Sequence, residues 1–278
     1  MRELPEVETI RRGFDKEVVG KKVKTVDVTG MSAVGRHPNK KHFAHKLEGA
    51  KITGVERRGT ALVAPLDTDD VLLIELGSSG TLRKSAAKDE ITDDTQVVIT
   101  FTQGGQLRLL DGADTARMSV LAADDLATEH PELASLGLDP VESPISWVVF
   151  GELLRRHDTK LRPLLLDQRI IAGLGDLYVD EILFASGLRP DRTAGTLSSQ
   201  EVRRLYRSVV EIMHDAMKYR GTSLDGDGFT DIYGGAGDYG DHLQVHGREK
   251  QACRRCRTPI VKARVANATA FLCEQCQV

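Results

Sequence analysis

The first residues of the chain have the apolar spacing of an α-helix. Apolar side chains recur every three or four positions and so share one helical face; they are Leu4, Val7, Ile10 and Phe14. Pro5 suits a first helical turn, and the acids at positions 3, 6 and 8 favour the positive helix start. Gly13 is of the type that ends helices. The pattern predicts a short N-terminal helix that ends at about Gly13 and packs against the rest of the chain.

From residue 22 to about residue 120, short apolar runs alternate with turn signals. Gly104 and Gly105 predict a hairpin, and a short helix is expected at His42–Leu47. So many short strands in one segment predict a β-sandwich or a flattened barrel. The expected strands are Lys22–Val28, Ala50–Arg57, Ala61–Leu66, Val71–Leu76, Gln96–Thr102 and Gln106–Leu110.

The second half of the chain has the pattern of helices. The acidic segment Ala122–Pro144 holds three prolines, which is typical of a linker. Residues 221–241 contain seven Gly and five Asp with almost no aliphatic residues, which predicts a mobile loop that cannot bury itself. The expected helices are Trp147–Arg156 capped by Ser146, Lys160–Leu166 capped by Asp158 or Thr159, Val179–Ser186, and Gln200–Tyr219.

Length and charge narrow the class of protein. At 278 residues the chain has room for two domains. It has neither an apolar window of eighteen residues nor a signal-peptide pattern, so we expect a cytoplasmic protein that does not bind membranes. Residues 1–60 carry a net charge of +6, residues 61–241 carry −14, and residues 242–278 carry +5. Phosphate contact therefore requires that the two basic ends fold to the same face.

The C-terminal region contains two Cys-x-x-Cys pairs separated by sixteen residues: Cys253, Cys256, Cys273 and Cys276. Four thiolates at this spacing suit tetrahedral Zn²⁺ and leave no open coordination position, so we expect one structural zinc ion. Two disulfides are the alternative, which the lack of a secretion signal disfavours. The basic residues Arg254, Arg255 and Arg264 give the module a surface suited to phosphates, although a solvated basic face explains them equally well.

Together these elements predict an α+β fold in the following order: a β-sandwich domain at 1–133, a linker at 134–145, a helical domain at 146–220, a mobile loop at 221–241 and a zinc finger at 242–278.

Six stretches and the cysteine pairs, taken in order, carry a further signal: residues 2–13, 56–59, 76–80, 136–140, 166–184 and 244–248. The series resembles the formamidopyrimidine-DNA glycosylase and endonuclease VIII family of base-excision repair enzymes along nearly the whole chain. The resemblance implies that the helical domain is a helix-two-turns-helix element. It also implies a damaged or abasic DNA duplex as partner, no organic cofactor, and a monomer.

In that family the amine of a proline at position 2 attacks C1′ of the damaged nucleotide, and the following glutamate assists. The resemblance therefore implies Glu3 and Glu6 as catalytic residues, and Arg117 and Arg162 as DNA contacts beside the arginines of the finger.

The chain departs from the family pattern at the positions that carry this chemistry. Arg2 replaces the proline, and its guanidinium stays protonated and cannot form a Schiff base. Retention of Met1 would put its α-amine one residue, about 3.5 Å, from the family location, beyond what reactive geometry tolerates. Other exchanges are Thr60 for Lys, Glu75 for His, Asp176 for Asn and Ala268 for Arg. The residues that match the family's wedge between bases are Ser78, Ala116 and Met118.

Three functions fit these observations. The first is a repair protein of this family that has lost or reassigned the glycosylase and lyase chemistry. The second is an active glycosylase for an unusual or bulky lesion, which uses Glu3 to activate water and has a smaller wedge. The third is a binding module without enzymatic activity that uses the scaffold for a protein partner, which the acidic middle of the chain favours.

Overall fold

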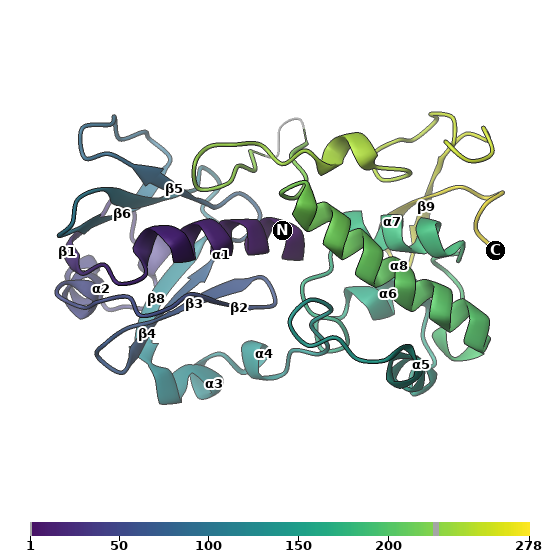
Figure 1. The fold of residues 1–278 in the computed structure, drawn as a ribbon, viewed down its shortest axis with the longest axis horizontal. Helices are drawn as coiled ribbons and strands as arrows, with labels where there is room; N and C mark the ends of the chain where they lie inside the picture. The colour runs from purple at the N-terminus through teal and green to yellow at the C-terminus, as the bar shows by residue number, and fades with distance from the viewer. Residues whose placement is uncertain (1, 225–227) are drawn as a thin grey trace. The chain divides into compact units, whose positions relative to one another are not determined.

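A computed structural model describes residues 2–224 and 228–278, and the chain divides into two compact units (Figure 1). Unit 1 comprises Met1–Ala134 and Tyr219–Asp238, and unit 2 comprises Ser135–Lys218 and Tyr239–Val278. Met1 itself, with the α-amine considered above, lies outside the described residues. Among the described residues, no helix combines the length and the apolar character that crossing a membrane requires.

Unit 1 is built on two antiparallel four-stranded sheets that share one apolar core with helix α1. The first sheet has the order β1 (Val23–Val28), β6 (Thr95–Phe101), β7 (Gln106–Leu110), β5 (Thr81–Ser85). The second has the order β2 (Glu56–Arg58), β3 (Ala61–Pro65), β4 (Asp70–Glu75), β8 (Arg117–Ala122). The predicted β-sandwich and the hairpin at Gly104 and Gly105 are confirmed.

The sequence pattern did not predict two of the strands, β5 and β8. β5 contains a single aliphatic residue, Leu82, and its remaining side chains are polar, so it lacks the apolar run of a buried strand. β5 nevertheless pairs with β7, a partner more than twenty residues away. β8 begins with Arg117, whose side chain donates to carbonyls of the preceding turn. In the predicted strand Ala50–Arg57, only single-residue bridges at Lys51 and Ile52 precede β2.

Helix α1 extends over Leu4–Val18 and passes through Gly13, so the predicted end at Gly13 was wrong. A Cβ atom at Gly13 would lie 2.8 Å from Cγ1 of Ile232. The glycine therefore permits close packing of the 219–238 segment on the helix and does not stop it. The shorter helical elements of unit 1 are η1 (Ser32–Val34), α2 (Lys40–Leu47), η2 (Ala123–Asp125), α3 (Leu126–Glu129) and α4 (Pro131–Ala134).

The predicted mobile loop covers residues 221–241, of which 225–227 lie outside the described residues. The prediction that this segment cannot bury itself was wrong for the described part. Phe229 and Ile232 are 2% and 0% exposed and belong to the core of unit 1. The backbone N–H of Lys84 donates to the carbonyl of Ile232 at 2.8 Å, and the hydroxyl of Thr81 donates to the carbonyl of Thr230 at 2.9 Å. Two apolar side chains are thus enough to fasten the segment beside β5.

Unit 2 contains the predicted helices and a two-stranded finger. Its helical elements are α5 (Trp147–Arg155), α6 (Leu161–Leu166), α7 (Asp176–Ser186), η3 (Ala194–Thr196), α8 (Ser199–Lys218) and η4 (Tyr239–His242), and its strands are β9 (Val261–Val265) and β10 (Ala268–Leu272). The Ser146 cap of α5 is confirmed, since its hydroxyl accepts from the N–H of Val149 at 3.3 Å. The predicted cap of α6 was wrong: its N-cap residue is Lys160, and carbonyls of Pro190 and Arg192 accept its first N–H groups.

Candidate functional site

The start of α1 holds two buried carboxylates, Glu3 and Glu6, which are 7% and 5% exposed. They form a reciprocal capping box, in which each side chain accepts from the backbone N–H of the other residue. Oε1 of Glu6 also accepts from the N–H of Thr222 at 2.7 Å. Both predicted catalytic carboxylates are therefore brought together, and both make contacts that hold the helix start. Glu6 in addition fastens the 219–238 segment to α1.

Arg2 is buried beside these carboxylates, at 5% exposure. Its backbone N–H donates to the carbonyl of Gly77 at 3.0 Å, and Nε and Nη2 donate to the carbonyls of Gly80 and Ser79 at 3.3 and 3.4 Å. Its Cζ lies 5.3 Å from the ring centroid of Phe229, within the range of a cation–π contact. Arg2 thus ties the turn 77–80 and the 219–238 segment to the N-terminus.

The turn 77–80 is fixed from its other side by residues 111–116. Gly77 has a φ of +61°, and a Cβ there would lie 2.6 Å from the carbonyl oxygen of Thr115, so only glycine fits. Asp111 accepts from the hydroxyl of Ser79 and, at 2.6 Å, from the N–H of Ala116. Burial raises the pKa of Asp111, but these hydrogen bonds together outweigh burial and hold the pKa below its ordinary value.

This arrangement contradicts part of the predicted wedge. Ala116 and Met118 are 1% and 2% exposed and point into the core of the sandwich, so neither side chain can enter a base stack. Ser78 is exposed, as is the neighbouring turn from Gly112 to Asp114. The exposed turn has no apolar side chain beyond Ala113, which explains why hydrophobic spacing gave no signal for it.

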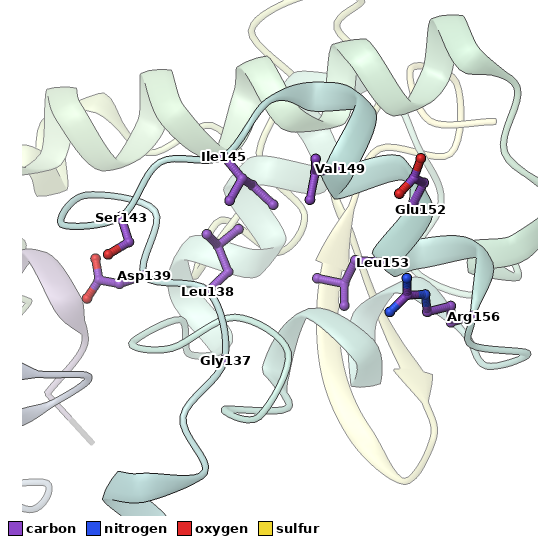
Figure 2. A pocket seen from close by; sticks show the side chains of 9 residues that line it. All are labelled: Gly137, Leu138, Asp139, Ser143, Ile145, Val149, Glu152, Leu153 and Arg156. Atoms are coloured by element: carbon purple, nitrogen blue, oxygen red, sulfur yellow. The ribbon is translucent and has the colours of Figure 1, made fainter.

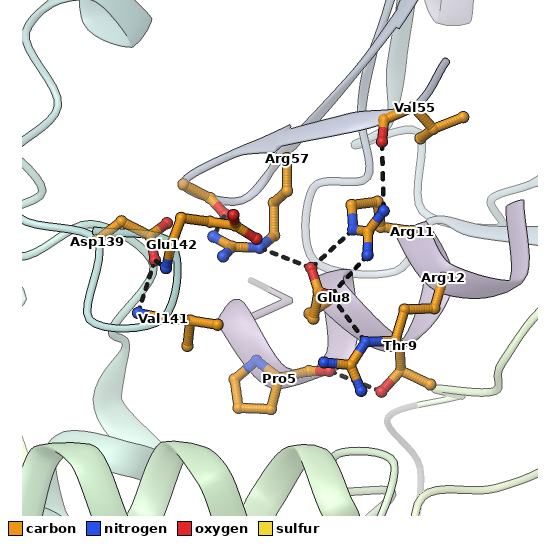
Figure 3. A network of polar contacts seen from close by, with 11 residues as sticks. Pro5, Glu8, Thr9, Arg11, Arg12, Val55, Arg57, Asp139, Val141 and Glu142 are labelled. Carbon is orange, nitrogen blue, oxygen red and sulfur yellow. Dashed lines mark hydrogen bonds and ion pairs between the residues drawn. The ribbon is translucent and has the colours of Figure 1, made fainter. Parts of the chain in front are cut away.

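A third carboxylate on α1, Glu8, binds three arginine side chains (Figure 3). The sequence pattern did not predict this cluster. The Glu8 oxygens accept from Arg11 and Arg12 at 2.8 to 2.9 Å and from Nε of Arg57 on β2 at 3.2 Å. Arg11 also donates to the carbonyl of Val55. Burial raises the pKa of Glu8, but its bonds to Arg11 and Arg12 and the charge of Arg57 outweigh burial and keep the pKa below its ordinary value. Arg58 of the Glu56–Gly59 motif is exposed. Arg57 of the same motif is buried and pairs with Glu8.

Arg162, a predicted DNA contact, is buried in unit 2. Its side chain is 1% exposed, and its guanidinium is ion-paired with Asp176 and, at 3.1 Å, with Asp180. Asp180 also accepts from the N–H of Phe271 and bonds the ring of His246 at 2.9 Å. The DNA contact at Arg162 stays a prediction, and in this structure the guanidinium is occupied by the two aspartates. The residue links α6 and α7, and Asp176 is one of its partners.

Glu181, the next residue of α7, anchors the segment that leads into the finger. Its carboxylate accepts from the backbone N–H groups of Gln244, Val245 and His246 at 2.8 to 2.9 Å. Burial raises its pKa above the ordinary value against these hydrogen bonds. The Gln244–Arg248 motif thus has a structural explanation that sequence alone did not provide.

The four cysteines converge as predicted. Their sulfur atoms lie within 4.8 Å of one another, with Cys253 to Cys276 at 3.9 Å and Cys256 to Cys273 at 3.4 Å, and none forms a disulfide. Tetrahedral zinc with bonds of about 2.3 Å separates its sulfurs by about 3.8 Å, so the donor set fits one structural zinc ion. Cys253 and Cys273 pack against Phe184, Val245 and Ile260 in a small apolar cluster.

The remaining predicted arginines lie at the surface of their units. In unit 2, Arg254 and Arg255 are exposed, although each donates one hydrogen bond to a carbonyl, of Asp241 and Phe184 respectively. Arg264 is exposed on β9. In unit 1, Arg117 is half-buried and donates to the carbonyls of Asp114 and Ala116. These side chains remain the candidates for phosphate contact.

Unit 2 also has a pocket of about 390 Å³ beside α5 (Figure 2). Its floor is apolar, with Leu138, Ile145, Val149 and Leu153, and Glu152 and Arg156 lie together at one end. Gly137, Leu138 and Asp139 of the 136–140 stretch line it, but none of the predicted catalytic, DNA-binding or zinc residues does.

Sequence profiles of three domains match the chain in order. They are the formamidopyrimidine-DNA glycosylase N-terminal domain at residues 1–118, the H2TH domain of the same enzyme at residues 136–226, and the zinc finger found in FPG and IleRS at residues 250–278.

Whole-chain relatives agree with these profiles. The chain is 37% identical to the formamidopyrimidine-DNA glycosylase of Geobacillus kaustophilus over 278 residues, which covers all of both chains. It is 36% identical to that of Enterococcus faecalis over all of this chain and 97% of the relative. Among solved structures, the Lactococcus lactis FPG mutant G226P with DNA containing Fapy-dG superposes with a TM-score of 0.89, at 29% identity and 99% coverage of each chain. L. lactis Fpg with abasic-site DNA gives 0.88 at the same identity and coverage.

Proposed function

Because the chain belongs to the formamidopyrimidine-DNA glycosylase family, we propose that it binds damaged or abasic duplex DNA. We propose further that it does not form a covalent Schiff base between an N-terminal amine and C1′ of the damaged nucleotide. The fold is that of the family's DNA glycosylases, and the similar L. lactis proteins are seen with damaged or abasic DNA. The loss of the covalent step is our inference from the residues at the start of α1.

The buried contacts of Arg2 carry this proposal. A guanidinium stays protonated at any working pH and has no lone pair for attack on a sugar carbon. Here it also bonds to two carbonyls of the 77–80 turn, so it contributes to the packing of the helix start. Glu3 and Glu6 bind backbone N–H groups in the same region. These contacts support a structural role for the three residues at the family's reactive end.

Binding is tested by electrophoretic mobility shift. A duplex with an abasic-site analogue is compared with the same duplex undamaged, over a series of salt concentrations. We expect tighter binding to the abasic duplex and a steep loss of affinity with rising salt. Arg254→Ala and Arg264→Ala should each lower the slope of log affinity against log salt by about 1. Arg207→Ala, an exposed arginine of α8 outside the finger, is the matched control and should leave the slope unchanged.

Two outcomes contradict the binding proposal. Absence of binding at low salt would favour a protein partner, and equal affinity for both duplexes would remove the preference for damage. The catalytic alternative is tested separately, by release of modified bases from a panel of damaged duplexes. We expect no release; release by the native chain that is lost in Glu3→Gln would establish a working glycosylase.

A further inference from the structure

A second group of side chains able to bind a metal lies in unit 1, between residues 75 and 132. One ring nitrogen of His130 and one carboxylate oxygen each of Glu75 and Glu132 lie within 4.8 Å of one another. Glu75 is the last residue of β4, His130 follows α3, and Glu132 is in α4. Three ligands from three elements therefore converge at one end of the second sheet.

The backbone on both sides of His130 is held in place. Its N–H donates to the carbonyl of Leu126 at 2.9 Å, and its carbonyl accepts from the N–H of Leu133 at 3.0 Å. Leu126 and Leu133 pack on the outer apolar face of the second sheet. On that sheet, Glu75 of β4 is paired in register with Ala61 of β3. The backbone that carries the imidazole is thus held by hydrogen bonds on both sides, and Glu75 lies in a paired strand.

One ring nitrogen of His130 is unsatisfied. The side chain of His130 is 0% exposed; its Nδ1 lies 2.9 Å from Oε1 of Glu132, and its Nε2 has no hydrogen-bond partner among the described residues. The Glu75 carboxylate, which is half-buried, has no ion-pair partner within residues 2–224 and 228–278. A cation between two carboxylates relieves their mutual repulsion.

We propose that Glu75, His130 and Glu132 bind one divalent transition-metal ion, separate from the zinc of the four-cysteine finger. One imidazole and two carboxylates form a donor set that suits Zn²⁺ and Mn²⁺. Bonds of about 2.0–2.1 Å in tetrahedral geometry separate ligand atoms by about 3.3 Å. The 2.9 Å between Nδ1 of His130 and Oε1 of Glu132 is near this value, and the ligand atoms of all three residues lie within 4.8 Å of one another. Three protein ligands leave the remaining positions to water.

Mn²⁺ distinguishes this site from the finger because four thiolates select softer ions. The probe is Mn²⁺ alone, added to the full chain with its finger loaded with zinc, and the loss of the free Mn²⁺ signal in electron paramagnetic resonance measures binding. We expect one saturable Mn²⁺ per chain. Glu75→Gln and Glu132→Gln should each weaken binding at least tenfold. Glu129→Gln removes an exposed carboxylate from the same segment and should leave the affinity unchanged.

Both substituted carboxylates are at least partly exposed, so these variants do not depend on the core for folding. Absence of Mn²⁺ binding by the native chain overturns the proposal. So does an affinity that is the same in the native chain, Glu75→Gln and Glu132→Gln, since the ion would then be adventitious. As a second readout, bound Mn²⁺ should broaden the ring resonances of His130 in the nuclear magnetic resonance spectrum, and unbroadened His130 resonances at saturation would contradict the assignment.

Discussion

The start of α1 in unit 1 and the four-cysteine finger in unit 2 are both family motifs, but they differ in how their side chains are used. In the finger, the four residues that the motif specifies converge on one point with the separations that zinc requires. At the start of α1, the motif forms its helix, yet Arg2, Glu3 and Glu6 bind backbone groups of the protein itself.

The difference follows from where the partners come from. A metal site needs only the right ligands at the right spacing, and the two cysteine pairs supply all four ligands within the last 26 residues. The partners of Arg2 and Glu6 are more than 70 and 200 residues away in the chain, at Gly80 and Thr222. Local spacing therefore predicts the ligands of the finger, whereas the contacts of Arg2 and Glu6 depend on turns that are distant in the sequence.

The largest expected effect is the local unfolding of the finger when it loses its zinc. Cys273→Ser removes one of four thiolates, and because zinc binding supplies about 10 kcal/mol or more to the folding of such a module, we expect loss of the finger's zinc and local unfolding. Zinc content after dialysis and limited proteolysis of residues 242–278 measure this. Glu274→Gln, an exposed neighbour, is the control and should retain the metal. A finger of Cys273→Ser that resists protease would contradict the prediction.

The next effect concerns the Glu8 cluster of α1. Glu8→Gln removes a buried negative charge from beside Arg57, whose side chain is 0% exposed. We expect a loss of about 3 kcal/mol in the free energy of unfolding, measured in urea. Arg12→Gln removes a partner that is 57% exposed and should cost under about 1 kcal/mol. Equal costs for the two variants would show that burial does not decide the strength of these pairs.

A smaller effect is expected from the link between α1 and the 219–238 segment. Glu6→Ala removes the acceptor for the N–H of Thr222 and for that of Glu3, each buried. We expect a loss of about 1–3 kcal/mol and faster hydrogen exchange at the Thr222 amide. Glu56→Ala, at an exposed carboxylate, should change neither quantity. Unchanged exchange at Thr222 in Glu6→Ala would mean that other contacts hold the segment.

The smallest expected effect is a dependence of stability on pH. The pKa values of Glu8 and Asp111 are both held below the ordinary value in the folded chain. Their contribution is therefore fully present above the unfolded pKa of about 4 and is lost as pH falls through the folded values. Urea unfolding between pH 7 and pH 3 should show this decline, and it should be shallower in the double variant Glu8→Gln, Asp111→Asn. An equally steep decline in that variant would assign the effect to other carboxyls.

Sequence patterns predicted the elements with strong local signals and failed where distant residues decide. The apolar runs of β1, β3, β4, β6 and β7 and the four cysteines are confirmed by the structure. β5 was missed because its partner is non-local. The burial of Phe229 and Ile232 was missed because two apolar side chains hardly change the average composition of a segment rich in Gly and Asp. Arg162 looks like a surface cation in sequence, but Asp180 pairs with it inside unit 2. Ala116 and Met118 were misplaced because strand alternation turns both toward the core.

The central claim is that a family scaffold here retains its folding motifs while Arg2 and its contacts replace the covalent chemistry. Borohydride reduction during incubation with abasic-site duplex DNA tests it most directly, read as the intact mass of the chain, with a family enzyme that has the N-terminal proline as positive control. We predict that the mass of this chain stays unchanged while the control gains the mass of a DNA strand. A chain whose mass increases by that strand, with the link mapped to its N-terminal peptide, would contradict the claim.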